Sequence, residues 1–224
     1  GGIIMAESAI YPSLRDRVVF VSGGASGIGA AIVEQFCLQG AKVSFVDIDA
    51  DAAASLADDI AARDLPRPRF LPCDLKDVEA LQYTIGQVIT ADGPITALIN
   101  NAANDERHTI DDVTPAYFDD RIAVNLRHQF FATQAVHGPM AEAGGGAIVN
   151  IGSVTWLIGQ GGMPCYSASK AAVAGLTRSL ARDLGPKNIR VNSVLPGWIM
   201  TKRQMDNWLT PEGEAELMQR QCLK

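Results

Sequence analysis

One stretch decides the fold: Arg17-Val18-Val19-Phe20-Val21-Ser22-Gly23-Gly24-Ala25-Ser26-Gly27-Ile28-Gly29. Its short apolar, β-branched first half predicts a buried strand that ends in glycines. Residues 30–38 follow with helical spacing, and Gly40 ends the expected helix. In a strand, turn and helix of this kind, the glycines permit a tight turn and a close backbone approach to a pyrophosphate at the helix N-terminus. The spacing is Gly-x-x-x-Gly-x-Gly rather than the commonest fingerprint. A glycine-rich turn without a ligand is the alternative, and the strand and helix around it favour dinucleotide binding.

The rest of the chain continues the alternation of strands and helices. Strands are expected at residues 17–22, 42–47, 69–73, 95–99, 147–151 and 189–195. Helices are expected at 30–38, 50–62, 76–91, 114–143 and 166–184. Such alternation predicts an α/β fold, a Rossmann-like, doubly wound parallel sheet with helices on both faces. We expect a single domain over residues 14–224. Residues 1–13 are expected to be a lead-in that begins with the vector-derived Gly1-Gly2-Ile3-Ile4 ahead of Met5.

Composition excludes several classes of function. Of the 224 residues, 47% are apolar and 20% are charged, as in globular proteins. The net charge of -6 argues against nucleic acid as the main partner. No apolar run approaches the ~18–20 residues of a membrane span, and no signal peptide is recognisable. The four cysteines are scattered without a Cys-x-x-Cys pair, and the three histidines lack metal-ligand spacing. We therefore expect a cytoplasmic protein without disulfides or a metal site.

The second expected strand ends in a carboxylate. Asp47 lies where an acid usually accepts hydrogen bonds from the adenosine ribose, and its charge would repel a 2′-phosphate. No basic residue follows it directly, so the sequence favours NAD over NADP. The alternative is that Asp47 caps a helix, although Asp49 is the better cap for the helix from Ala50.

A tyrosine and a lysine stand four residues apart in a stretch of small side chains. On a helix, Tyr166 and Lys170 would lie on one face, one turn from each other. A nearby ammonium favours the phenolate form of a tyrosine, whose free pKa is near ~10, so the pair can act as a base. Alone, the pair is more often an ordinary surface contact. The motifs elsewhere in the chain change that balance.

From about Leu14 to Lys224 the chain resembles the short-chain dehydrogenase/reductase family. Five motifs carry the resemblance in the expected order, and they are the Gly23-x-x-x-Gly27-Ile28-Gly29 turn, Asp74, Asn100-Asn101-Ala102, Ser153 before Tyr166-x-x-x-Lys170, and Pro196-Gly197. Each motif alone is weak, but together they are specific to this family.

The resemblance implies catalytic roles for four residues. Tyr166 would take the proton of the substrate hydroxyl, and Lys170 would lower the tyrosine pKa and hold the nicotinamide ribose. Ser153 would bond the substrate oxygen, and Asn125 would hold a water behind the lysine. These roles agree with general acid–base chemistry in which the cofactor carries the hydride. The alternatives are a turn-capping serine and an asparagine satisfied by backbone, although asparagine has a poor mid-helix propensity.

The resemblance also implies a cofactor site and a subunit arrangement. The expected cofactor-binding residues are Gly23, Ser26, Gly27, Ile28, Gly29, Asp47, Asp74, Leu75, Asn101, Ala102, Ala103, Tyr166, Lys170, Pro196, Gly197, Ile199 and Thr201. Ala103 stands where the family usually has glycine, which suggests a slightly different loop. Members of the family usually continue through a seventh strand, which the sequence up to Lys224 does not include. They form dimers or tetramers, so we expect a homotetramer or homodimer.

Within the family, three segments resemble bacterial aldose 1-dehydrogenases, which oxidise xylose, arabinose, fucose or galactose. The segments are 101–108, 121–129 and 198–204. The polar loop after the fourth strand would supply the paired donors and acceptors that a sugar needs. The expected substrate-binding residues are Asn104, Arg107, His108, Ser153, Tyr166 and Trp198. Each loop residue could equally be solvated or lie at a subunit contact. The alternative functions are a short-chain reductase of a 3-ketoacyl, steroid or polyol substrate, or a non-catalytic protein of the same fold.

Overall fold

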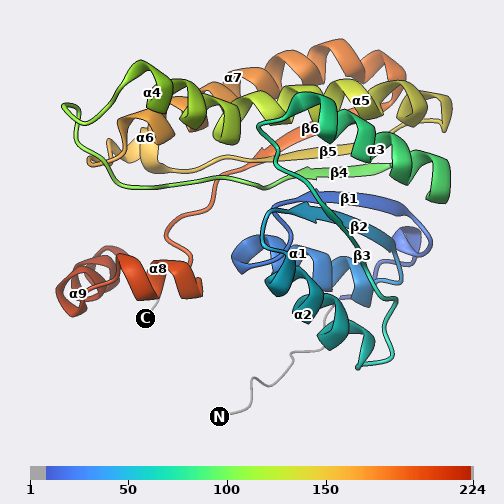
Figure 1. Cartoon of the computed structure of the whole chain (residues 1–224), viewed down its shortest axis with the longest axis horizontal. Helices are drawn as coiled ribbons and strands as arrows, with labels where there is room; N and C mark the ends of the chain where they lie inside the picture. The colour runs from blue at the N-terminus through green and yellow to red at the C-terminus, as the bar shows by residue number, and fades with distance from the viewer. Residues whose placement is uncertain (1–8, 223–224) are drawn as a thin grey trace.

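The computed structural model of the chain describes residues 9–222, and the expected vector-derived start lies outside them. Its centre is a six-stranded parallel sheet with the order β3-β2-β1-β4-β5-β6 (Figure 1). The strands are β1 (Val18–Ser22), β2 (Lys42–Asp47), β3 (Arg69–Pro72), β4 (Ala97–Asn100), β5 (Gly146–Ile151) and β6 (Ile189–Val194). The predicted α/β fold with a doubly wound parallel sheet is confirmed.

Helices cover both faces of the sheet (Figure 1). On one face lie α1 (Gly27–Leu38) and α2 (Ala50–Ala61). On the other lie α3 (Val78–Asp92), α5 (His128–Glu142) and α7 (Pro164–Leu184), and α4 (Pro115–Ile122) packs against α7. Shorter elements are the 3₁₀-helices at Pro12–Leu14 and Gly185–Lys187, the helix α6 (Thr155–Ile158), and α8 (Lys202–Asn207) and α9 (Pro211–Arg220) after β6.

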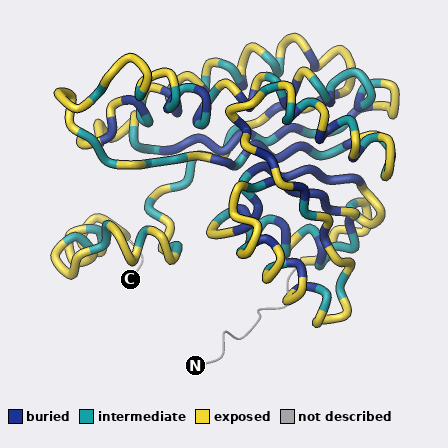
Figure 2. The backbone as a smooth tube through the Cα atoms, in the orientation of Figure 1, coloured by how far each residue is buried: buried dark blue, intermediate teal, exposed yellow. Residues whose placement is uncertain are grey.

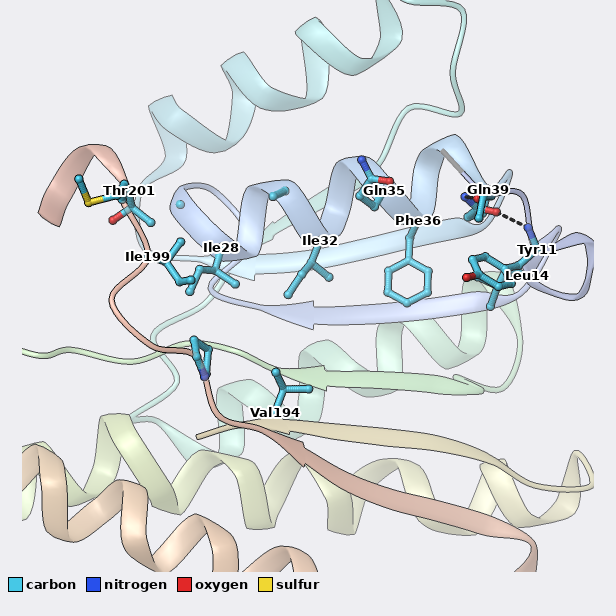
Figure 3. Close-up of a pocket in the computed structure, with 15 residues that line it drawn as sticks. Tyr11, Leu14, Ile28, Ile32, Gln35, Phe36, Gln39, Val194, Ile199 and Thr201 are labelled. Carbon is cyan, nitrogen blue, oxygen red and sulfur yellow. Dashed lines mark hydrogen bonds between the residues drawn. The ribbon is translucent and has the colours of Figure 1, made fainter. Parts of the chain in front are cut away.

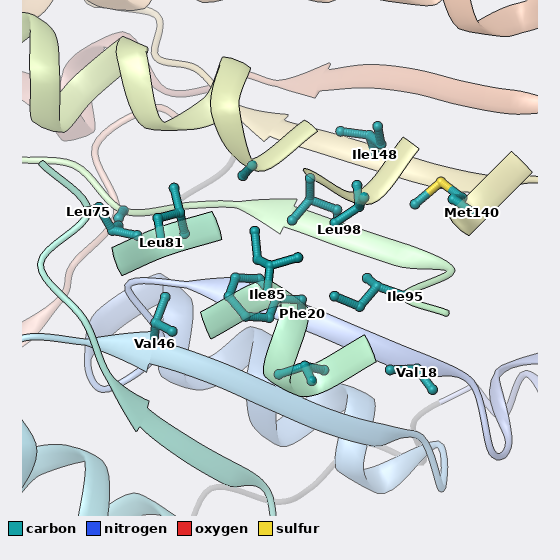
Figure 4. Packing of buried hydrophobic residues seen from close by; sticks show 14 of the residues in the cluster. Val18, Phe20, Val46, Leu75, Leu81, Ile85, Ile95, Leu98, Met140 and Ile148 are labelled. Carbon is teal, nitrogen blue, oxygen red and sulfur yellow. The ribbon is translucent and has the colours of Figure 1, made fainter. Parts of the chain in front are cut away.

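Alternation along the strands divides the apolar core into two layers. In β1, Val18 and Phe20 belong to the layer under α3 and α5, whereas Val19 and Val21 belong to the layer under α1 and α2. Figure 4 shows the first layer, where Phe20 packs among side chains from several elements. Because all five β1 residues are buried, the strand reads as a continuous apolar run in the sequence. Burying Phe20 alone stabilises the fold by about 2–3 kcal/mol.

The strand order fixes where a ligand can bind. The chain runs outward from β1 through β2 to β3, then returns to the other side of β1 with β4. A crevice therefore opens at the carboxyl ends of β1 and β4, the switch point of a doubly wound sheet. The burial map in Figure 2 shows a buried sheet between more exposed helices, with α8 and α9 on an exposed arm.

The structure corrects three details of the expected elements. The helix expected over 114–143 is not uniform, because a π-helical segment, Ala123–Arg127, separates α4 from α5. The helix expected from Lys76 begins at Val78, where the Asp77 side chain caps it by accepting from the Ala80 amide. The helices α8 and α9 were not expected at all. Within residues 9–222, no helix is long and apolar enough to span a membrane.

Candidate active site

The turn after β1 cannot accommodate side chains at two of its glycines. Gly23 has φ of +66°, and a Cβ there would lie 2.7 Å from the Ala102 Cα. A Cβ on Gly29 would lie 1.8 Å from the Gly23 carbonyl oxygen. Ser26 is the N-cap of α1, yet its side chain makes no capping hydrogen bond, so the first amides of that helix keep their donor capacity. The turn thus fits the phosphates of a dinucleotide, as its sequence predicts.

Asp47 joins the end of β2 to this turn. Its Oδ2 accepts from the Ala25 amide at 2.9 Å, and its Oδ1 accepts from the amides of Ile48 and Asp49. Asp49 is the helix cap, since its side chain accepts from the Ala52 amide. Asp47 is therefore free of the capping role considered as the alternative. A carboxylate retains further lone pairs, which a ribose hydroxyl can use.

The end of β4 is fixed to the end of β1. The Asn101 Nδ2 donates to the carbonyls of Ser22 and Gly23, and the Asn101 amide donates to the Ser22 hydroxyl. Asp74, expected near the adenine, is exposed and accepts from the Lys76 amide, while Leu75 is buried in the core. These contacts hold the walls of the switch-point crevice in a fixed register.

Tyr166 and Lys170 lie on the first turns of α7, and Lys170 is almost completely buried. The Lys170 Nζ donates to the Ile151 carbonyl at 2.7 Å and lies 5.6 Å from the centroid of the Tyr166 ring. Burial lowers the pKa of Lys170 to about 8, and the negative charge of Asp105 opposes that shift. The lysine therefore lies close to the tyrosine but directs its ammonium toward the sheet.

The pKa of Tyr166 is raised above its ordinary value, chiefly by burial. A hydrogen bond with Ser153 acts in the lowering direction, whereas the charge of Asp105 raises the pKa further. The sequence led us to expect that Lys170 would lower this pKa. The structure differs, because the desolvation of the phenol is the larger effect and the ammonium is bonded to the Ile151 carbonyl.

Ser153 follows β5 and lies beside the tyrosine. The residue is buried, and its hydroxyl oxygen accepts from the Thr155 amide at 3.2 Å, which fixes the turn into α6. A hydroxyl can accept one hydrogen bond while it donates another. Ser153 thus caps the turn, as the alternative role predicted, and its hydroxyl hydrogen can still be donated to a substrate oxygen.

Asn125 lies inside the π-helical segment and is completely buried. Its Oδ1 accepts from the Asn104 amide at 2.8 Å, and its Nδ2 donates to the Asn104 carbonyl at 3.1 Å. Single π-helical turns often occur at functional sites. Here the side chain is satisfied by backbone, which is the alternative considered from the sequence, and its two bonds anchor the loop after β4.

His108 connects the same loop to the start of α7. Its Nε2 accepts from the Cys165 amide at 3.3 Å, so we assign the ring proton to Nδ1. Nδ1 lies 3.0 Å from both the Glu106 carbonyl and the Tyr117 hydroxyl. The side chain of Asn104 accepts from the Glu106 amide. Both residues were expected to bind substrate, and in this structure their polar atoms bond to the protein.

A cavity of about 680 Å³ opens beside Tyr166. Among the residues expected from the sequence, those that line it are Ile28, Asn101, Ala103, Arg107, Ser153, Tyr166, Lys170, Pro196, Gly197, Trp198, Ile199 and Thr201. Asn104, His108 and Asn125 are not in its lining. Asp105, which the sequence placed in the polar loop beside the expected pocket, also lines the cavity, although it was not among the expected substrate-binding residues. The sequence interpretation missed Gln204 of α8, whose segment 198–204 was noted only for its resemblance, and it missed Glu216 and Arg220 of α9, to which nothing in the sequence pointed.

A second cavity, of about 990 Å³, runs beside α1 and is lined mainly by apolar side chains (Figure 3). Ile32 and Phe36 project into it from α1, and Val194 borders it from β6. At its far end the Tyr11 amide donates to the Gln39 side chain. Ile28, Ile199 and Thr201 line both cavities, so the two are neighbours. Ser153, Tyr166 and Lys170 line the smaller cavity and not this one.

The chain matches the family profile described as short chain dehydrogenase over residues 17–212. It belongs to the short chain dehydrogenase family. The match agrees with the tyrosine, lysine and serine that meet at the cavity, and the family implies a nicotinamide cofactor. This short chain dehydrogenase is therefore an enzyme, an oxidoreductase.

Two curated relatives are similar over nearly the whole chain. A probable galactose dehydrogenase, GalD, of Rhizobium meliloti (strain 1021) is 48% identical over 217 residues, which cover 97% of this chain and 85% of the relative. A D-xylose 1-dehydrogenase of Caulobacter vibrioides (strain NA1000 / CB15N) is 47% identical over 218 residues, with 97% and 86% covered. The resemblance that the sequence motifs indicated is confirmed.

Solved structures show the same fold. A dehydrogenase/reductase from Sinorhizobium meliloti 1021 is 35% identical and superposes with a TM-score of 0.81, covering 90% of this chain and 79% of that one. A short chain dehydrogenase from Mycobacterium smegmatis is 30% identical and superposes with a TM-score of 0.80, covering 86% of this chain and 81% of that one.

Proposed function

We propose that this short chain dehydrogenase oxidises an aldose at C1 to the sugar lactone, with NAD as the cofactor. The observation that carries the proposal is the cavity itself. It places Ser153 and Tyr166 beside a wall that carries the polar side chains of Asp105, Arg107 and Gln204. The similarity to a galactose dehydrogenase and a xylose 1-dehydrogenase supports the same substrate class.

Each catalytic side chain has a distinct part in this reaction. Tyr166, as its phenolate, takes the proton of the C1 hydroxyl and becomes the phenol, and the Ser153 hydroxyl bonds the same oxygen. Burial lowers the pKa of Lys170 to about 8, which places its proton exchange near physiological pH. Lys170 and the turn after β1 would hold the nicotinamide cofactor, which would supply the hydride acceptor for C1. Asn125 keeps the loop after β4 in place through its two bonds to the Asn104 backbone.

The preference for NAD is inferred from Asp47. Its carboxylate lies at the end of β2 beside the turn, where it accepts from the Ala25 amide. A second negative charge, such as a 2′-phosphate, would be repelled there, whereas a 2′-hydroxyl can donate to it. The adjacent Ile48 and Asp49 offer no positive charge.

A substrate screen with both cofactors tests the proposal. The panel includes pentoses, hexoses, 6-deoxyhexoses, polyols, hydroxysteroids and 3-ketoacyl esters at matched concentrations. We expect turnover of at least one aldose with NAD, and a strong loss on analogues that lack ring hydroxyls, because the polar cavity groups are then left unpaired. If a steroid or acyl substrate is turned over and no aldose is, the sugar assignment fails.

We also propose a cytoplasmic homodimer or homotetramer. The apolar residues Phe118 of α4 and Phe130 of α5 are 44% and 43% exposed, although α5 packs on the sheet with another face and α4 packs against α7. Exposed aromatic side chains on two consecutive helices can pair across a two-fold axis. A monomeric mass in light scattering at micromolar concentration would contradict this assembly.

A further inference from the structure

Two walls of the catalytic cavity come from segments far apart in the sequence. One is the loop after β4, which includes Asp105, and the other is α8, which includes Gln204. Figure 1 shows that α8 is connected along the chain to the rest of the domain by the segment after β6. The contacts between these two walls therefore decide whether the cavity is closed on its substrate side.

The Asp105 carboxylate makes the hydrogen bonds between these walls, while the Arg107 guanidinium lies 5.2 Å from the centroid of the Trp208 ring at the end of α8. The Gln204 Nε2 donates to the Asp105 Oδ2 at 2.6 Å, and the Arg203 Nε donates to the Asp105 Oδ1 at 3.3 Å. The Gln204 Oε1 in turn accepts from the Trp198 Nε1 at 2.8 Å, which orients the amide toward the carboxylate. The Asp105 side chain is only 19% exposed, so its bonds are partly shielded from water. Hydrogen bonds to charged groups are the stronger class.

The same carboxylate acts on the catalytic pair. The charged or titratable groups around it are Arg203 on α8, Arg107 on its own loop, and Tyr166 and Lys170 on α7. The negative charge of Asp105 raises the pKa of both Tyr166 and Lys170, while Arg107 lowers that of Tyr166. For Lys170, Asp105 opposes the effect of burial and favours the charged ammonium.

We propose that Asp105 is a positioning residue of this enzyme: its carboxylate joins the β4 loop to α8 across the cavity and fixes a negative charge beside Tyr166 and Lys170. The same side chain therefore supplies the hydrogen bonds to α8 and a negative charge in the cavity. That charge favours the ammonium form of Lys170. The inference concerns the chain's own contacts, so it does not require that the substrate be a sugar.

The closure is tested by amide hydrogen exchange of the full chain. We compare the amides of residues 202–207 in the wild type, Asp105→Ala, Gln204→Ala and the double variant. Each single variant should speed exchange in α8 by about tenfold, as expected for one charge-assisted bond. The double variant should exchange little faster than Asp105→Ala, because Asp105→Ala already removes the bond to Gln204 together with the bond to Arg203.

Asp206→Asn is the matched control. Asp206 belongs to α8 and pairs with Lys202 within that helix, without a contact to the β4 loop. An exposed pair of this kind stabilises a helix only slightly, so exchange should change by no more than about twofold. If Asp105→Ala and Gln204→Ala leave α8 exchange at the level of this control, the proposed closure is wrong.

The charge is tested by titrating the Tyr166 phenol directly. The ultraviolet absorbance of phenolate is recorded against pH, and the signal of Tyr166 is obtained by subtracting the Tyr166→Phe variant. The titration is carried out on the wild-type protein and on the Asp105→Asn variant, in which the side chain keeps a similar shape but loses its charge. Removing a negative charge that raises the Tyr166 pKa should move the midpoint to lower pH. A midpoint that stays or moves to higher pH would overturn the electrostatic part of the proposal.

Neither readout uses turnover. Failure of the proposed sugar oxidation would therefore leave both results interpretable, and failure of the Asp105 inference would leave the substrate screen unaffected. A purely structural role of Asp105 would change α8 exchange without moving the titration of Tyr166. Asp105→Glu, which keeps the charge, should retain the high phenol midpoint.

Discussion

Asn125→Ala should destabilise this enzyme through the loop after β4. In the structure the Asn125 side chain makes two hydrogen bonds with the Asn104 backbone, at 2.8 and 3.1 Å, from a completely buried position. Each bond contributes about 1 kcal/mol, and an unpaired buried amide or carbonyl adds a further penalty of about 1–3 kcal/mol. Because water can reach part of the loop, we expect a total loss of about 2–4 kcal/mol.

The loss can be measured by thermal unfolding. For a chain of this size, 1 kcal/mol corresponds to a shift of about 2–4 °C in Tm, so the variant should unfold about 5–15 °C below the wild type. The Asn104 amide should also lose its protection from hydrogen exchange. Gln134→Ala is the control, because its amide accepts only from the exposed Gln82 side chain on α3. It should shift Tm by less than about 2 °C.

The Asn125 result also separates two roles. If turnover falls while Tm and the protection of the Asn104 amide stay at wild-type values, Asn125 serves a proton relay alone. The loop-anchoring account would then be wrong. If Tm, protection and turnover fall together, the side chain acts by holding the loop that carries Asp105 and Arg107.

Four further predictions concern single residues of the site and its support. Tyr166→Phe removes the proton acceptor but keeps the ring, so turnover should fall by ~10²–10⁴-fold with cofactor binding retained, as measured by kinetics and cofactor titration. Asp47→Ala should reduce the preference for NAD over NADP in kcat/KM by at least about tenfold, since the repelling charge is gone; an unchanged ratio would remove Asp47 from cofactor selection. Gly29→Ala should lower Tm or abolish folding, because its Cβ would lie 1.8 Å from the Gly23 carbonyl oxygen. The pKa of His128 is lowered from 6.5 to about 3, mainly by burial and secondly by the positive charge of Lys170. Between those two pH values the unfolded chain therefore binds a proton that the folded chain does not. Stability should fall as the pH drops through this window, by up to about 1.4 kcal/mol per pH unit, and urea unfolding of His128→Gln should show a flatter dependence.

The fold was predictable because its signals are local. The β-branched run before Gly23, the glycine spacing and the carboxylate at the end of β2 depend on neighbours in the sequence, and each lies where it was expected. The pairing of Tyr166 with Lys170 is also local, since one helix carries both. The alternation of elements predicted a doubly wound parallel sheet, but the order β3-β2-β1-β4-β5-β6 comes from the structure.

The rest of the site depends on contacts between distant segments. The bond from Gln204 to Asp105 spans 99 positions, and the bond from Asn125 to Asn104 joins a π-helical turn to a loop. No periodicity marks such pairs, so the polar loop could be predicted to be functional but its internal bonds could not. The direction of the Tyr166 pKa was also missed, because burial depends on how completely the surrounding elements enclose the phenol.

The most direct test of the central claim is identification of the product. The purified enzyme is incubated with NAD and each aldose in turn, and the sugar product is analysed as the reduced cofactor accumulates. We expect one sugar lactone formed per NAD reduced, and lactone formation slowed by ~10²–10⁴-fold in the Tyr166→Phe variant. Turnover of another substrate class without any lactone, or lactone formation that the Tyr166→Phe variant sustains at the wild-type rate, would contradict this expectation.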